Sequence, residues 1–311
     1  MDIKSAVVTG ANGFIGKAVT KNLLDAGAEV WAVIYGNNTL TDLENEKLHL
    51  IHASFEDYMN LADRIESKNI DAFFHFAWAG YGAATNDYNI QLDNVKYTCM
   101  AMECAIQVGA KRFIFADSSH EHLKSTNSKG AIEVCSIYGA SKHCAQVMCR
   151  VMAHNANIEF IGVMFVNIFG WGDPSARSTN SLIRKLQNGE DLKLVEADRI
   201  HNWTYIDDCV NGIIAAATYG VAGTVYYVGS APRTFGEIMT DVRDVINPSA
   251  KLYFGVYQDP TAIDFSQFDI NALHRDTGYV AKTDFKEAIV KTSEWLYLLD
   301  GRTENQNEKR G

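Results

Sequence analysis

Three glycines lie between an apolar run and a helical pattern near the amino terminus, in Val7-Val8-Thr9-Gly10-Ala11-Asn12-Gly13-Phe14-Ile15-Gly16. Gly10 permits a tight turn out of a strand, Gly13 lets backbone approach a ligand, and Gly16 lets the next helix pack closely on a sheet. The first turn of such a helix presents N–H groups and a positive dipole end to a diphosphate. The spacing G-x-x-G-x-x-G differs from G-x-G-x-x-G and is compatible with a purely structural turn. Its place between a strand and a helix nevertheless favours ligand binding.

Short apolar runs alternate with helical stretches along the first half of the chain. We expect strands near 6–9, 30–34, 71–76, 113–116 and 160–164, and helices near 17–26, before Gly109 and around 138–153. The run at 71–76 is apolar rather than alternating, as in a strand that is buried on both faces. This pattern predicts an α/β fold with a doubly wound parallel sheet covered by helices on both sides.

The rhythm loosens after Asn167, which indicates a second lobe. We expect a dinucleotide-binding lobe over 1–167 with a return segment near 203–228, and a smaller α+β lobe over 168–202 and 229–300. Residues 301–311 are polar and are expected to form a disordered tail. The length of 311 residues is sufficient for one large domain or two interleaved lobes.

Composition argues against several classes of protein. No run approaches the ~20 apolar residues of a membrane span, and the start lacks an apolar signal region, so we expect a cytoplasmic protein without membrane contact. A net charge of -10 disfavours a nucleic-acid surface. The six cysteines form no C-x-x-C pair and no His/Cys cluster of ligand spacing, so we expect reduced thiols and no metal.

A tyrosine and a lysine stand four residues apart in Tyr138-Gly139-Ala140-Ser141-Lys142. On a helix they share one face, so the ammonium can lean toward the phenol. A nearby positive charge favours the phenolate and draws the tyrosine pKa down from about 10 toward neutrality. Tyr138 could then exchange a proton with a hydroxyl or a carbonyl of a substrate. The spacing alone is common, and it gains weight from the glycine turn.

These motifs, with others in the same order, resemble those of the extended short-chain dehydrogenases/reductases, in the NAD-dependent epimerase/dehydratase family of nucleotide-sugar type. The resemblance covers nearly the whole chain and rests on the glycine turn, Phe74-His75-Phe76-Ala77, Asn94, Lys111-Arg112-Phe113-Ile114-Phe115-Ala116-Asp117-Ser118-Ser119, Tyr138-x-x-x-Lys142, Asn167-Ile168-Phe169-Gly170, Tyr205-Ile206-Asp207-Asp208 and a closing segment from Asp269 to Trp295. It implies a Rossmann-type lobe that binds NAD(H) or NADP(H), a smaller carboxy-terminal lobe over the substrate, and a homodimer formed through two helices per subunit.

The resemblance also implies roles for single residues. Tyr138 is the expected acid/base, Lys142 holds the nicotinamide ribose and lowers the tyrosine pKa, and Ser118 hydrogen-bonds the reacting oxygen, with Ser119 a rival by one residue. Asn94 would support the helix or a water relay. The expected cofactor-binding residues are Gly10, Asn12, Gly13, Phe14, Ile15, Tyr35, Ser54, Phe55, Ala77, Asn94, Tyr138 and Lys142. The expected substrate-binding residues are Ser119, Asn167 and Arg177.

The sequence departs from the family pattern at both ends of the expected ligand. No acidic residue closes the second strand in Val30-Trp31-Ala32-Val33-Ile34-Tyr35-Gly36-Asn37-Asn38, which slightly favours NADP(H), with Tyr35, Asn37 and Asn38 as donors to its phosphate. The usual arginines for a diphosphate are missing near His201 and Asp259. Arg177, Arg184 or Arg233 could supply that charge, although each is more typical of a solvated surface.

The resemblance leads us to expect an NAD(P)-dependent enzyme acting at C4 of a nucleotide-linked sugar, as a 4-ketoreductase or a 4-epimerase. A dehydratase is the next hypothesis, because Glu121 with His120 echoes an acidic pair, although a His-Glu-His run more often only satisfies its own hydrogen bonds. A non-catalytic NAD(P)-binding sensor or scaffold is the remaining alternative. His75 is interpreted as a satisfied core histidine.

Overall fold

The computed structural model describes residues 2–36, 40–125, 136–259 and 261–301. The chain divides into two compact units. Unit 1 comprises Met1–Phe165, Val210–Val228 and Ile263–Val280, and unit 2 comprises Val166–Cys209, Gly229–Ala262 and Ala281–Gly311. We predicted 263–280 in the second lobe and 203–209 in the first. In the structure, 263–280 belongs to unit 1 and 203–209 belongs to unit 2.

The assignment of 263–280 has a visible cause. The Tyr226 hydroxyl donates to Asp276 Oδ2 over 2.8 Å, and the ring of Tyr227 stacks on Phe268 with centroids 5.7 Å apart. Both tyrosines belong to β12, the edge strand of the unit 1 sheet, so side-chain contacts attach the late segment to that strand. Such contacts leave no periodic pattern in a sequence.

Unit 1 is built on a seven-stranded sheet, with order β12-β7-β5-β4-β1-β2-β3, in which every pairing is parallel. Its strands are β1 (Ser5–Thr9), β2 (Glu29–Ile34), β3 (Leu48–His52), β4 (Ala72–His75), β5 (Arg112–Ser118), β7 (Glu159–Phe165) and β12 (Val225–Tyr227). The central strands are buried along their length, because helices cover both faces of the sheet. The predicted fold class is confirmed.

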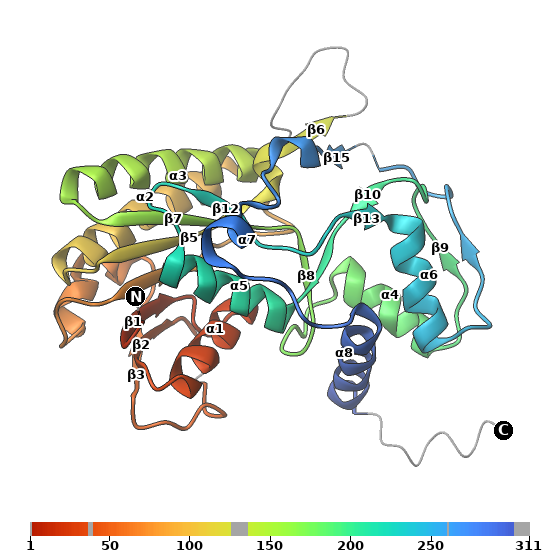
Figure 1. Cartoon of the computed structure of the whole chain (residues 1–311), viewed down its shortest axis with the longest axis horizontal. Coiled ribbons are helices and arrows are strands. Elements are labelled where there is room, and N and C mark those ends of the chain that lie inside the picture. The colour runs from red at the N-terminus through yellow and green to blue at the C-terminus, as the bar shows by residue number, and fades with distance from the viewer. Residues whose placement is uncertain (1, 37–39, 126–135, 260, 302–311) are drawn as a thin grey trace. The chain divides into compact units, whose positions relative to one another are not determined.

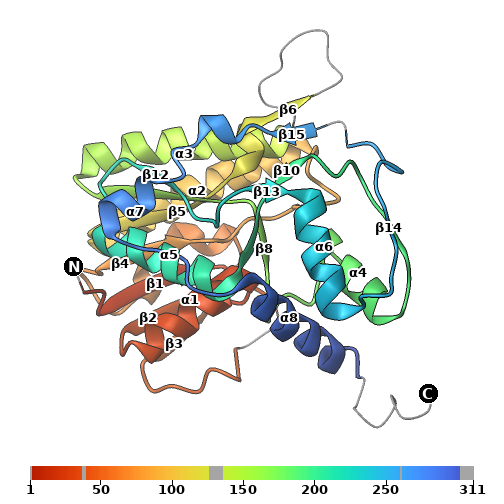
Figure 2. The ribbon, with the colours of Figure 1, turned by 45° about the vertical axis from the view of Figure 1, so that its right-hand side comes forward.

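The helices of unit 1 lie on two sides of this sheet (Figures 1 and 2). One side carries α1 (Phe14–Asp25) and the later part of α5 (Ile206–Tyr219), and the other carries α2 (Tyr88–Gln107), α3 (Ile137–Ala156) and η1 (Glu56–Arg64). The shorter unit 1 elements are η2 (Ser119–His122), β6 (Leu123–Ser125), η3 (Phe265–Gln267) and α7 (Ala272–Thr277).

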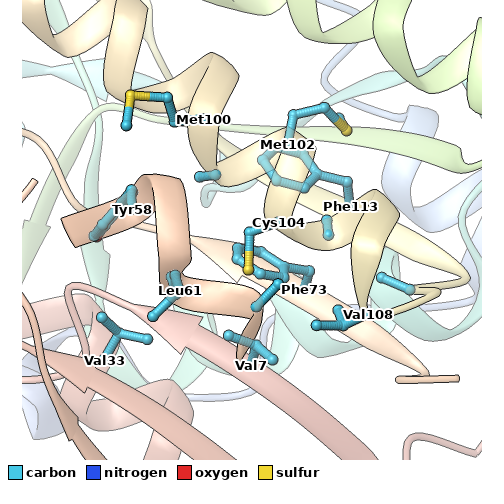
Figure 3. Close-up of a cluster of buried hydrophobic side chains, with 14 of the residues drawn as sticks. Val7, Val33, Tyr58, Leu61, Phe73, Met100, Met102, Cys104, Val108 and Phe113 are labelled. Atoms are coloured by element: carbon cyan, nitrogen blue, oxygen red, sulfur yellow. The ribbon is translucent and has the colours of Figure 1, made fainter. Parts of the chain in front are cut away.

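A large apolar core joins the sheet to α2, α3 and η1 (Figure 3). Val7, Phe73 and Phe113 project from three neighbouring strands into this core, and Phe73 stacks on Phe113 with centroids 5.5 Å apart. Leu61 of η1 and Met102 of α2 close the core and are fully buried. Burial of a whole aromatic or aliphatic side chain contributes about 1.5–3 kcal/mol, so this core stabilises the sheet and the helices packed on it.

Unit 2 is formed by short strand pairs and three helices. The pairs join β8 (Asn167–Phe169) to β11 (Trp203–Tyr205), β9 (Leu192–Lys193) to β14 (Leu252–Tyr253), and β10 (Ile200–His201) to β13 (Arg233–Thr234). The helices are α4 (Ser178–Gln187), α6 (Phe235–Ile246) and α8 (Phe285–Leu299). A further short strand, β15 (Thr261–Ile263), lies between β14 and α7 in the chain. Arg184 on α4 donates twice to Asp300 at the end of α8, so the two helices are linked by a bidentate ion pair.

The described ranges contain no helix with the length and apolar character that a membrane crossing requires. The same ranges contain no group of three or more His, Cys, Asp or Glu side chains placed to hold a metal ion.

Candidate active site

The glycine turn forms a close backbone contact at the carboxyl edge of the unit 1 sheet. Gly10 has a φ of +67°, and a Cβ on it would lie 2.7 Å from the nitrogen of Ala77. A Cβ on Gly16 would lie 2.1 Å from the oxygen of Gly10, so the helix sits directly on the turn. Gly13 is the N-cap of α1, and no side chain of the described residues caps that helix. The first-turn amides therefore remain suitable donors to an anion, which fits a dinucleotide.

The expected adenosine-side residues lie around the ends of β2 and β3. Asn12 Nδ2 donates to the Tyr35 carbonyl over 2.6 Å, which links the glycine turn to the end of β2. The Tyr35 side chain is 75% exposed, so it is accessible to a ligand. Ser54 Oγ is bonded to Asp57, and Phe55 stacks on Tyr97 with centroids 4.9 Å apart. Asn37 and Asn38 lie outside the described residues.

Asn94 anchors the loop that follows β4. Its side chain is buried, accepts from the Ala79 amide over 2.8 Å and donates to the Ala79 carbonyl over 2.9 Å. In the same loop the Trp78 indole donates to Gln91 over 2.9 Å. Two residues of α2 thus hold the segment that contacts Gly10. The expected direct role of Asn94 toward a cofactor stays a prediction.

Tyr138 and Lys142 lie in the first turns of α3, which begins after Ser136, whose hydroxyl accepts from the Gly139 amide. Lys142 is 4% exposed, and its Nζ donates to the Ala116 carbonyl over 2.7 Å. The same ammonium lies 3.8 Å from the centroid of the Trp78 ring. Burial lowers the pKa of Lys142 to about 7, and the charge of Asp117 opposes this shift.

Aromatic rings surround Tyr138, which is itself buried. Trp78, Tyr81 and His120 each meet its ring edge-on, with centroids 5.9, 5.4 and 5.3 Å away. Trp78 therefore contacts Tyr138 and Lys142 at once, and joins them to the loop beside Gly10. Trp78 and Tyr81 could not be predicted as neighbours of Tyr138, because their only sequence signal was a position just after the third predicted strand.

Ser118 ends β5, and its hydroxyl oxygen accepts from the His120 amide over 3.2 Å. Since that bond uses a lone pair, the hydroxyl hydrogen remains able to donate to a substrate oxygen. Ser119 is also buried and lies in η2. Of the two serines, Ser118 is hydrogen-bonded to His120, whose ring lies edge-on to that of Tyr138. The structure thus brings together Ser118, Tyr138 and Lys142 within unit 1.

The segment after Ser118 is only partly satisfied by its own hydrogen bonds. Glu121 Oε2 meets His143 Nδ1 of α3 at 3.1 Å. Within the described residues, Glu121 Oε1 and His120 Nδ1 are buried without a hydrogen-bond partner. The interpretation of this run as a fully satisfied structural element is therefore wrong for these two atoms. Burial lowers the pKa of His120, so its imidazole is neutral at neutral pH.

His75 is a satisfied core residue, as the sequence predicted. Its Nδ1 lies 2.7 Å from Thr9 Oγ1, and its Nε2 lies 3.1 Å from Thr98 Oγ1. Thr98 donates its own hydrogen to Asn94 O, so it accepts from Nε2, and Nδ1 accepts from Thr9. Burial lowers the pKa of His75 to about 3, with a smaller contribution from the charge of Lys142.

The remaining expected substrate residues belong to unit 2. Asn167 begins β8 opposite Trp203 of β11. Arg177 precedes α4, with its Nε 3.8 Å from Asp173 Oδ2. The two other candidate arginines are paired more tightly, Arg184 with Asp300 and Arg233 with Asp241. All three arginines thus have carboxylate partners in the structure, and Arg177 has the longest of the contacts.

A parallel sheet of this order, with a glycine turn after its first strand, is a Rossmann-type fold, the class of fold that binds dinucleotides at this edge of the sheet. The model of the NAD dependent epimerase/dehydratase family matches residues 6–229, and the chain belongs to this family. The predicted family is confirmed, and so is the prediction of an enzyme that depends on a nicotinamide dinucleotide.

Several known proteins are similar over almost their full lengths. A dTDP-glucose 4,6-dehydratase of Escherichia coli is 23% identical, over 93% of this chain and 92% of its own. An uncharacterized protein of Methanocaldococcus jannaschii is also 23% identical, over 95% and 97%. Among solved structures, the UDP-glucose 4-epimerase of Thermotoga maritima with UDP-glucose has a TM-score of 0.75 at 18% identity, over 95% of this chain and 99% of that one. An epimerase of Methanothermobacter thermautotrophicus has a TM-score of 0.77 at 19% identity, over 99% and 95%. At these identities the structures show the shared fold.

Proposed function

We propose that this protein oxidises and reduces C4 of a sugar linked to a nucleoside diphosphate, as a 4-epimerase or a 4-ketoreductase. The observation that carries the proposal is the contact of Tyr138 and Lys142 with the loop that contacts the glycine turn. Ser118, the third residue, accepts a hydrogen bond from the His120 amide, and the ring of His120 meets that of Tyr138. Trp78 contacts two of the three residues, and its neighbour Ala77 contacts Gly10. A hydroxyl, a phenol and an ammonium beside a dinucleotide site form the set that proton-coupled hydride transfer needs.

The chemistry divides among these three side chains. When bound, the nicotinamide ring supplies the site that takes up or gives back a hydride. Tyr138 removes the proton from the C4 hydroxyl during oxidation and returns a proton to the C4 oxygen during reduction. Ser118 donates a hydrogen bond to that oxygen and stabilises its developing charge. Lys142, while charged, favours the phenolate form of Tyr138.

The proposed cofactor is a nicotinamide dinucleotide, whose diphosphate the backbone amides after the glycine turn would bind. The family description supports NAD(H). The absence of a carboxylate after β2 is the sequence feature that supports NADP(H), and the exposed Tyr35 lies at that position. The two are distinguished by mass analysis of the nucleotide that co-purifies. Retained NAD(H) would favour a 4-epimerase, which returns its hydride to the substrate, and an empty site that binds NADPH would favour a 4-ketoreductase.

The substrate proposal draws on the relatives, which act on or bind dTDP-glucose and UDP-glucose. Asn167 and Arg177 of unit 2 are proposed to contact it. Arg177 is the preferred diphosphate partner among the candidate arginines, because its side chain is 45% exposed, against 22% for Arg184 and 36% for Arg233. An arginine fork recognises diphosphate oxygens in pairs.

A dehydratase is the second candidate, and a specific observation favours it. Among the described residues, His120 and Glu121 each keep a buried polar atom without a hydrogen-bond partner, and the ring of His120 meets that of Tyr138. Such groups could remove a second proton from an oxidised sugar. Its product would be lighter than the substrate by one water, whereas an epimerase product has the same mass.

The test is turnover with UDP-, dTDP-, CDP- and GDP-sugars, followed by mass spectrometry of product and cofactor. Tyr138→Phe keeps the ring contacts and removes the phenol, so we expect turnover to fall by at least about a hundredfold. Tyr257→Phe, at an exposed tyrosine of unit 2, is the matched control and should leave turnover unchanged. Equal turnover in wild type and Tyr138→Phe would refute the assignment, and binding of cofactor without any turnover would favour a sensor.

We also propose a homodimer formed through α2 and α3, which lie side by side on one face of unit 1 (Figure 2). Their outer surfaces expose large apolar side chains, among them Leu92, Val147, Met148 and Val151, at 59, 45, 45 and 56%. Apolar residues gathered on neighbouring helices are typical of an interface. Light scattering should give the dimer mass for wild type and the monomer mass for Val151→Glu. A monomeric wild type contradicts this proposal.

A further inference from the structure

Lys142 places a charged group in the interior of unit 1. Its ammonium donates to one carbonyl, that of Ala116, and lies against the rings of Trp78 and Phe115. A carbonyl and two ring faces compensate only part of the hydration that a buried ammonium loses. A buried lysine therefore either loses its proton or needs a nearby negative charge.

Asp117 is a buried carboxylate next to the residue that binds this ammonium. It directly follows Ala116, whose carbonyl Lys142 binds, and is 3% exposed. Its Oδ1 accepts from the Ser118 amide over 2.8 Å, and its Oδ2 accepts from Gln146 Nε2. Gln146 lies one helical turn after Lys142 on α3. Both oxygens of the carboxylate are thus held, between the proposed catalytic serine and the helix that carries the lysine.

We propose that Asp117 is the counter-ion of Lys142 and a positioning residue of the active site, held in place by Gln146, and that its carboxylate keeps the Lys142 ammonium charged at neutral pH. The proposal deepens the proposed function, because it rests on the role of a charged Lys142 beside Tyr138. It explains why a glutamine and an aspartate are buried together at the end of β5, where an apolar pair would pack at lower cost in hydration.

The titration of the neighbouring groups agrees with this arrangement. Burial raises the pKa of Asp117 to about 6, against the opposing effects of Gln146, the Ser118 amide, Lys142 and His143. Asp117 acts in the opposite sense to burial on the pKa of Lys142. Besides Tyr138, the titratable groups around the pair are His75 on β4, whose pKa burial and Lys142 lower, and His143 on α3, which binds Glu121. Neither supplies negative charge, and Glu121 shares its carboxylate with His143.

The decisive variant is Asp117→Asn, which removes the charge and can keep both hydrogen bonds. Asparagine Oδ1 can still accept from the Ser118 amide, and its Nδ2 can donate to Gln146 once that amide turns over. In protein labelled with 13C-lysine, the Lys142 Cε resonance is identified by its loss in Lys142→Met and is followed against pH. We expect its midpoint to fall by about one to three pH units in Asp117→Asn.

Asp71→Asn is the matched control, because Asp71 lies before the amino end of β4 and pairs with Lys111. It should leave the Lys142 midpoint unchanged. If Asp117→Asn fails to fold, Gln146→Met removes the hydrogen bond that favours the Asp117 carboxylate and should lower the midpoint by a smaller amount. An unchanged midpoint in a folded variant of either kind overturns the proposal. The titration needs no substrate. A lack of turnover on nucleotide sugars would therefore overturn the proposed function, whereas only the Lys142 midpoint decides whether Asp117 is the counter-ion.

Discussion

Gly139 of α3 lies so close to His120 of η2 that a Cβ on the glycine would be 2.3 Å from the His120 carbonyl oxygen. The next residue along, Glu121, has its amide 3.2 Å from the same point. The missing side chain lets the segment after Ser118 rest directly on the helix that carries Tyr138 and Lys142. The distance between the proposed catalytic serine and tyrosine thus depends on the absence of a side chain at Gly139.

Gly139→Ala should therefore impair both stability and turnover. The added methyl forces the η2 backbone away from α3, and overpacking of this kind costs about 1–3 kcal/mol. We expect a lower free energy of unfolding in urea and a lower kcat. Ala140→Ser changes the neighbouring exposed position and should change neither quantity. A Gly139→Ala enzyme with the wild-type kcat would show that this approach does not set the active-site geometry.

Gly10→Ala should weaken cofactor binding more than its backbone strain alone explains. Gly10 and Gly223 both have positive φ, +67° and +82°, so alanine costs about 1–2 kcal/mol of unfolding free energy at each. A Cβ on Gly10 would also clash with Ala77, whereas no atom of the described residues lies within 4 Å of one on Gly223. Calorimetric titration with NAD(H) and NADP(H) should therefore give an affinity loss for Gly10→Ala that Gly223→Ala lacks. Equal losses would contradict the predicted cofactor contact.

His75 should make unit 1 sensitive to acid. Its pKa in the folded protein, about 3, lies below the ordinary value of 6.5, so the unfolded chain binds the proton more readily. The stabilisation is complete above pH 6.5 and is lost as the pH falls toward 3, which amounts to about 2 kcal/mol between pH 6.5 and 4.5. Urea unfolding of His75→Gln across this range should show a shallower dependence on pH than wild type. His154→Gln, at an exposed histidine, should keep the wild-type slope.

Arg177→Met should raise KM for a nucleotide sugar about tenfold with little change in kcat, because a lost charge-assisted contact to a diphosphate costs about 1.4 kcal/mol of binding. Arg184→Met provides the comparison, since that side chain is committed to Asp300 by two hydrogen bonds. It should lower the stability of unit 2 and leave KM near the wild-type value. The reverse pattern would assign the diphosphate contact to Arg184.

The fold and part of the candidate site were accessible from local patterns. The alternation of apolar strands with helices predicted the parallel sheet, and Gly16 predicted close packing of the first helix, seen here where Gly16 lies against the Gly10 carbonyl. The four-residue spacing of Tyr138 and Lys142 predicted a shared helix. It did not predict that Lys142 binds the Ala116 carbonyl and lies on Trp78.

The amino-acid sequence by itself determined the layered architecture, the glycine turn and the four-residue spacing of Tyr138 and Lys142. Each of these features follows from a local pattern that spans only a few residues. Tertiary structure alone decided that Gln146 donates a hydrogen bond to Asp117, that Gly139 contacts His120, and that 263–280 joins unit 1. These contacts join residues far apart along the chain or depend on which face of a strand is buried. Their energies come from desolvation and close packing, which exist only once the sheet and its helices have come together.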